Sequence, residues 1–142
     1  MFENVNIRSS VAVYVQIQNH VQFAVASGLM KPGDRLPSVL ELAKKLNVNL
    51  NTVVKSYREL DVMGIIYTRR GSGAFIKKGA EVKCRENCRK HVVARLHEIV
   101  SEAKAAGMTS PEVKATCTAS YASADNPYGE VPASVLALAK TK

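Results

Sequence analysis

Two amphipathic helical patterns separated only by residues 47–49 constrain the fold more than any other feature of the sequence. Ser38 and Glu41 have the spacing of a capping box, which predicts a short helix over residues 38–46. Asn49 is expected to cap a second helix, which Gly64 would end. Two helices joined by so short a connection cross at a steep angle, which is typical of a helix-turn-helix.

The flanking segments complete this unit. Residues 11–27 carry a broad apolar stripe and predict a first helix, with Ser10 as its cap and Gly28 at its end. Residues 65–68 and 73–77 are typical of short strands, and the glycines of "RRGSG" suit a tight hairpin between them. We therefore predict a winged helix-turn-helix domain over residues 1–78.

The remaining chain is predicted to be helical. Residues 81–106 contain no glycine or proline and should form one long helix ended by Gly107. Ser110 would cap another helix, with Pro111 in its first turn, that runs to about residue 120. The predicted fold class is thus mainly α with a small β-hairpin, with a helical dimerisation region over 79–120 and a flexible tail over 121–142. The apolar side chains expected at the subunit interface are Cys88, Val92, Leu96, Ile99, Val100 and Ala103.

The positive charge of the chain is concentrated in the helix-turn-helix and hairpin. The net charge is +8, and residues 31–78 hold ten Lys/Arg against four Asp/Glu. Such a block attracts polyanions, nucleic acid first, although a solvated basic face is the simpler alternative. We see no signal peptide and no apolar run long enough to span a membrane, and three cysteines do not form a paired disulfide framework. These features favour a cytoplasmic protein with no membrane partner.

The second helix of the pair presents a polar face. On a helical wheel, Val53, Tyr57 and Leu60 share the side expected to face the core, opposite a polar and basic side. Asn can pair with adenine, Arg or Lys can reach guanine or phosphate, and Val54 could contact a thymine methyl. We therefore predict that helix 49–63 enters the major groove and that wing 65–77 lies on the adjacent backbone or minor groove. The residues expected to contact DNA are Arg35, Ser38, Asn49, Asn51, Thr52, Lys55, Arg58, Arg69, Arg70, Gly71 and Ser72.

Residues 14–76 resemble the DNA-binding domain of the GntR family of bacterial transcription regulators. The likeness is carried by Tyr14, Gln16, Ile17, Gly28, Pro32 to Ser38, Glu41-Leu42-Ala43, Thr52-Val53, Leu60, Gly64, Gly71-Ser72-Gly73 and Phe75. "VNLNTVVKSYREL", "YTRRGSG" and the short C-terminal part are similar to the YtrA-type branch. The resemblance implies a homodimeric repressor that binds an inverted-repeat operator, a nearby operon as its target, and release by a small-molecule effector.

The sequence departs from the family where other branches have basic residues. Leu40, Leu50 and Val54 occupy positions at which many members carry a basic side chain that contacts DNA. The contacts would then shift to the amides and cations of helix 49–63 and to the wing. Base reading by amides and apolar contacts, more than by guanidinium groups, is the consequence we expect.

Two other classes of function remain open from the sequence. Cys84, Cys88 and His91 lie close together on a helical wheel and could form a metal- or redox-responsive site, although packing at a subunit interface is the simpler explanation of these cysteines. A winged helix can also serve as a protein-interaction module that docks an acidic partner. We find no catalytic set and no phosphate-binding loop, so we predict neither an enzyme nor a cofactor.

Overall fold

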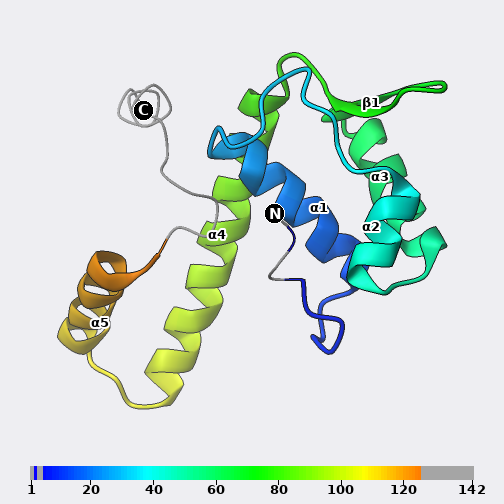
Figure 1. Cartoon of the computed structure of the whole chain (residues 1–142). Coiled ribbons are helices and arrows are strands. Elements are labelled where there is room, and N and C mark those ends of the chain that lie inside the picture. Colours follow the sequence, from blue (N-terminus) through cyan, green and yellow to red (C-terminus); the bar gives the residue numbers. More distant parts are fainter. Residues whose placement is uncertain (1, 3–4, 126–142) are drawn as a thin grey trace. The chain divides into compact units, whose positions relative to one another are not determined.

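The computed structural model describes Phe2 and residues 5–125, which form seven elements (Figure 1). Their mainly helical composition with one two-stranded antiparallel sheet confirms the predicted fold class. None of the helices in this part of the chain is long and apolar enough to cross a membrane. The elements are α1 (Val13–Ala26), α2 (Val39–Leu46), α3 (Leu50–Val62), β1 (Ile66–Arg69), β2 (Gly73–Ile76), α4 (Ala80–Ala105) and α5 (Ser110–Ser123).

The core of the winged unit lies between α1, α2, α3 and the hairpin. Helix α3 packs against both α1 and α2, as expected for a helix-turn-helix with a supporting helix (Figure 1). The predicted inward residues of α3, Val53, Tyr57 and Leu60, are all buried. Phe2 also enters this core, so the segment that precedes α1 contributes to it. The buried aliphatic side chains that join these elements include Ile17, Val21, Val25, Leu36, Leu42, Ile65, Ile66 and Ile76.

The hairpin is broader than the sequence predicts. Ile66 pairs with Ile76 and Arg69 with Gly73 in the two-stranded register. The segment before α2 adds to the free side of β2, because the amide of Leu36 donates to Ala74 and that of Ile76 to Asp34, each at 2.9 Å. This segment thereby lies at the base of the wing, where it brings residue 35 beside Phe75.

Two predicted helix caps are wrong. Helix α1 begins at Val13 after Ala12, which makes no side-chain cap, so Ser10 is not its cap. The side chain of Gln16 explains the late start, because it donates to the carbonyls of Asn6 and Val11 and holds that segment outside the helix. Helix α5 is capped by Thr109, whose hydroxyl accepts from the amide of Glu112, and not by Ser110.

The C-terminal boundaries also differ from those expected. Helix α5 continues to Ser123, so the first residues of the segment predicted as a tail are helical. The rest of that prediction, residues 126–142, lies outside the described residues. The compact winged unit extends to Cys88, beyond the boundary at residue 78, because Ala80, Cys84 and Cys88 of α4 are buried. Residues 89–125 form a second unit of two helices.

Candidate nucleic-acid interface

The turn between α2 and α3, residues 47–49, contains two asparagines that shape the start of α3. Asn47 ends α2 in the left-handed conformation with φ of 53°, a backbone geometry that asparagine tolerates better than most residues. Asn49 then caps α3, because its side-chain oxygen accepts from the amide of Asn51 at 2.8 Å. Of the two asparagines predicted to contact DNA, Asn49 therefore also caps α3, whereas the side chain of Asn51 remains exposed at the N-terminus of the helix.

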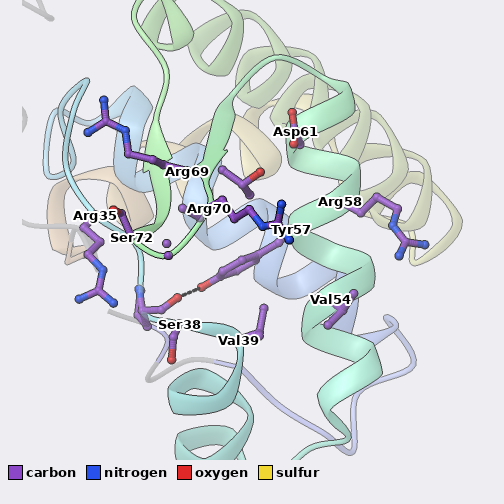
Figure 2. A pocket seen from close by; sticks show the side chains of 15 residues that line it. Arg35, Ser38, Val39, Val54, Tyr57, Arg58, Asp61, Arg69, Arg70 and Ser72 are labelled. Carbon is purple, nitrogen blue, oxygen red and sulfur yellow. Dashed lines mark hydrogen bonds between the residues drawn. The ribbon is translucent and has the colours of Figure 1, made fainter.

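Tyr57 fixes α3 relative to the segment before α2. Its hydroxyl donates to the carbonyl of Pro37 at 2.6 Å, and the ring lies between the two elements (Figure 2). Burial raises the pKa of this phenol well above its usual value, which keeps the donor proton in place. The polar connection thus orients the exposed face of α3 without using a group from that face.

An open groove of about 750 Å³ runs between α3, the start of α2 and the wing. Its lining contains four arginines and a single carboxylate, that of Asp61, so its charge favours an anionic ligand. Figure 2 shows Arg35 and Arg58 on opposite sides of this groove. Of the residues predicted to contact DNA, Arg35, Ser38, Arg58, Arg69, Arg70, Gly71 and Ser72 line it.

Arg35 approaches the backbone of the wing at Gly73. The Arg35 Nε lies 3.1 Å from where a side-chain Cβ on Gly73 would stand, and Gly73 has φ of +113°. The positive φ therefore favours glycine at this position, and any other side chain would also press against Arg35. The Glu41 carboxylate accepts a hydrogen bond from the amide of Ser38, and this bond is the main reason that the pKa of Glu41 is lowered. The positive charge of Arg35 also lowers this pKa.

The other predicted contacts lie outside the groove, toward the N-terminus of α3. Asn49, Asn51, Thr52 and Lys55 do not line it, and Thr52 is half-buried. The Lys55 ammonium lies 3.9 Å from the centroid of the Tyr14 ring on α1. Sequence reasoning missed this pairing, since nothing in the spacing of residues 14 and 55 indicates a contact. It also missed Asp61 and Thr68, which line the groove. The only signal for Asp61 was its place one helical turn after Arg58, and the only signal for Thr68 was its place next to Arg69.

The thiols that could have formed a metal site are buried. Burial is the main reason that the pKa of Cys84 and of Cys88 rises to about 12, which keeps both as inert thiols. Among residues 5–125, no three His, Cys, Asp or Glu side chains gather closely enough to hold a metal ion. The hypothesis of a metal- or redox-responsive site therefore finds no support in this part of the chain.

The residues predicted for a subunit interface fall into two groups. Cys88 is only 7% exposed within a single chain and belongs to the winged unit. Val92, Leu96, Ile99 and Val100 are exposed along α4, and Ala103 is half-buried. The interface prediction thus rests on the second group.

Comparisons with known proteins agree with this architecture. A family model described as bacterial regulatory proteins of the gntR family matches residues 13–76, the segment from α1 to β2. The transcriptional repressor YtrA of Bacillus subtilis is 41% identical over 101 residues, which cover 71% of this chain and 78% of YtrA. The chain belongs to the GntR family. Because the match to YtrA is longer than the family segment, it also places the chain in the YtrA-type branch, as predicted.

Solved structures of other GntR-family regulators extend the comparison beyond the winged unit. A GntR family regulator from Listeria monocytogenes has 32% identity and a TM-score of 0.61, covering 78% of this chain and 96% of its own. YtrA from Sulfolobus acidocaldarius has 28% identity and a TM-score of 0.51, covering 87% and 99%. The chain is thus a GntR-family transcription regulator with a winged-helix DNA-binding fold, and the family consists of regulators, not enzymes.

Proposed function

We propose that the protein is a repressor that binds an inverted-repeat operator as a homodimer. Helix α3 enters the major groove, and the wing contacts the adjacent backbone or minor groove. The observation that carries the proposal is the basic groove, because its four arginines come from three separate parts of the winged unit: the segment before α2, α3 and the wing. Four cations held on one face, beside the exposed amide of Asn51, suit phosphates and base edges together.

Selection from a random duplex library tests the DNA-binding proposal without knowledge of the operator. The purified full chain should enrich a sequence with two-fold symmetry, and its affinity for that sequence should fall steeply as salt rises. Replacing Asn51 with alanine should relax the preference for the selected bases, since a bidentate amide contact discriminates by about 1–3 kcal/mol. Enrichment of no sequence at physiological salt would contradict the proposal and favour a protein partner.

Two substitutions that each remove one positive charge test the contribution of the wing separately. Arg69→Ala removes a cation from the groove, whereas Lys114→Ala removes one from α5, outside it. The first should weaken binding to operator and random duplex by similar factors, and the second should change neither. Equal effects of the two variants would show that overall charge, not the groove, drives binding.

The homodimer proposal rests on the absence of a core in the second unit. No residue between 89 and 125 is buried, and the large apolar side chains of α4 in this range are mostly exposed, Ile99 by 53%. Two helices with no buried residues gain little from packing and are marginal alone in water. Pairing with a second copy would bury the stripe formed by Val92, Leu96, Ile99, Val100 and Ala103, which recurs at helical spacing.

Sedimentation of two variants tests the dimer, each variant carrying one new carboxylate at a different position of α4. Leu96→Glu puts a carboxylate in the stripe, whereas Val82→Glu puts one on an exposed residue of α4 within the winged unit. The parent and Val82→Glu should sediment as dimers and Leu96→Glu as a monomer, because an unpaired charge in an apolar interface is strongly unfavourable. A Leu96→Glu variant that remains dimeric would place the interface elsewhere.

Control by a small-molecule effector stays a prediction of the family resemblance.

A further inference from the structure

The exposed face of α3 has two flanks that contact different parts of the winged unit. Val54 and Arg58 line the groove on the wing side. On the other flank, Glu59 accepts a hydrogen bond from Gln18 of α1, and the Lys55 ammonium lies over the Tyr14 ring. At about 100° per residue, Asn51 falls between Arg58 and Lys55 around the helix. Lys55 therefore belongs to the α1 flank, away from the wing.

The contact with Tyr14 determines where the charge of Lys55 is held. A lysine ammonium on an exposed helix is usually a mobile point charge on a flexible stem. The distance of 3.9 Å from the ring centroid is well inside the range of cation–π attraction, so the ring restrains the ammonium on the α1 side. Because Lys55 is exposed, it remains accessible to an anion in that position.

We propose that Tyr14 positions Lys55 to contact a phosphate of the DNA strand that runs beside α1. This inference rests on the proposed function and assigns Lys55 to the backbone, not to guanine. The major groove is about 12 Å wide and a helix with its side chains about 10–12 Å across, so a docked α3 has one DNA backbone on each flank. Arg58 and the wing hold one backbone, and Lys55 on Tyr14 holds the other, which extends the interface onto α1.

The experiment measures dissociation constants of the full chain for a selected operator and for a random duplex, each over a series of salt concentrations. Lys55→Met keeps an unbranched side chain of nearly the same length without its charge, and it should weaken both complexes by the same factor, leaving their ratio unchanged. It should also reduce the slope of log affinity against log salt by about one per subunit. Asn51→Ala is the comparison, since it should change the ratio and leave the slope unaltered.

Two substitutions of Tyr14 separate its ring from its hydroxyl. Tyr14→Phe keeps the aromatic face and should bind as the parent does. Tyr14→Leu removes the face and should weaken both complexes about two- to fivefold, the range expected for an exposed cation–π contact. In the Lys55→Met background, Tyr14→Leu should have no further effect, because the residue acts only through the ammonium. Urea midpoints of all variants identify any loss that reflects unfolding, and Tyr14→Phe and Lys55→Met test the proposal even if Tyr14→Leu fails to fold.

Three results would overturn this inference. A Lys55→Met variant with altered preference at one operator position and an unchanged salt slope would make Lys55 a base contact. A folded Tyr14→Leu variant that binds as the parent does would show that the ring positions nothing. Additive losses in the double variant would mean that the two residues act independently. A parent without sequence preference would contradict only the proposed function, because the salt slope on random duplex still reports the contact of Lys55.

Discussion

Replacing Tyr57 with phenylalanine isolates the polar connection that orients α3. The Tyr57 side chain is 5% exposed, and its hydroxyl donates to the Pro37 carbonyl at 2.6 Å. Phenylalanine fills nearly the same volume, so the apolar packing of the ring is kept. The substitution therefore removes one hydrogen bond between α3 and the segment before α2.

The expected loss follows from what the missing hydroxyl leaves behind. A typical hydrogen bond contributes about 0.5–1.5 kcal/mol net, and a buried acceptor left without a partner costs about 1–3 kcal/mol. Pro37 is half-buried, so water reaches its surroundings in part and the lower end of the second range applies. We expect the free energy of unfolding to fall by about 1–2 kcal/mol, or the midpoint temperature by about 4–8 °C for each kcal/mol in a domain of this size.

Urea unfolding followed by circular dichroism measures this loss at one fixed protein concentration, because a dimer's stability depends on concentration. Tyr67→Phe is the matched control: Tyr67 is 37% exposed on β1, and it stacks on Phe75 through its ring. Removing that exposed hydroxyl should change the free energy of unfolding by less than about 0.5 kcal/mol. If the two variants lose the same stability, the Tyr57 hydroxyl contributes nothing net and the argument from burial is wrong.

Substitutions at three further positions test local features of the winged unit. Asn47→Ala should lower the free energy of unfolding by about 1 kcal/mol, because alanine adopts the left-handed φ of 53° only with strain. Asn47→Gly should not lower it, since glycine adopts this φ without strain, and urea midpoints would show the difference. Gly73→Ala should cost about 1–2 kcal/mol and displace Arg35, which thermal unfolding and DNA affinity together would detect. The thiol of Cys84 has its pKa raised from 9.0 to about 12, so its stabilising contribution is full below pH 9 and is lost as pH rises toward 12. Cys84→Ala should therefore show a shallower loss of stability between pH 8 and pH 10.5 than the parent.

The sequence predicts the helix-turn-helix well because its signals are local. The capping box of Ser38 and Glu41, the cap at Asn49 and the stop at Gly64 each act within a few residues. Their spacing indicates where α2 and α3 begin and where α3 ends. The apolar period of α3 then determines which side faces the core, and so which side is left for DNA.

Features that depend on distant contacts could not be predicted in this way. Gln16 holds residues 6–11 outside α1, and this contact overrides the helical pattern that begins at residue 11. Cys88 has the helical spacing of the α4 stripe, yet the winged unit buries it, because α4 starts by packing on that unit. The Tyr14–Lys55 contact joins two elements whose crossing angle no local pattern encodes. In each case a contact that the apolar periodicity does not encode determines where the residue lies in the structure.

The two units also differ in what stabilises them, and this difference bears on specificity. The winged unit buries a continuous core, whereas residues 89–125 bury no side chain within one chain. If these residues pair subunits as proposed, the second unit is stable only in the dimer. A single winged unit reads one half-site, and joining two of them makes the second contact intramolecular, which can raise affinity about 10²–10⁴-fold without any new DNA contact. Selectivity for an inverted repeat would then depend on α4 and α5, which carry none of the residues assigned to DNA.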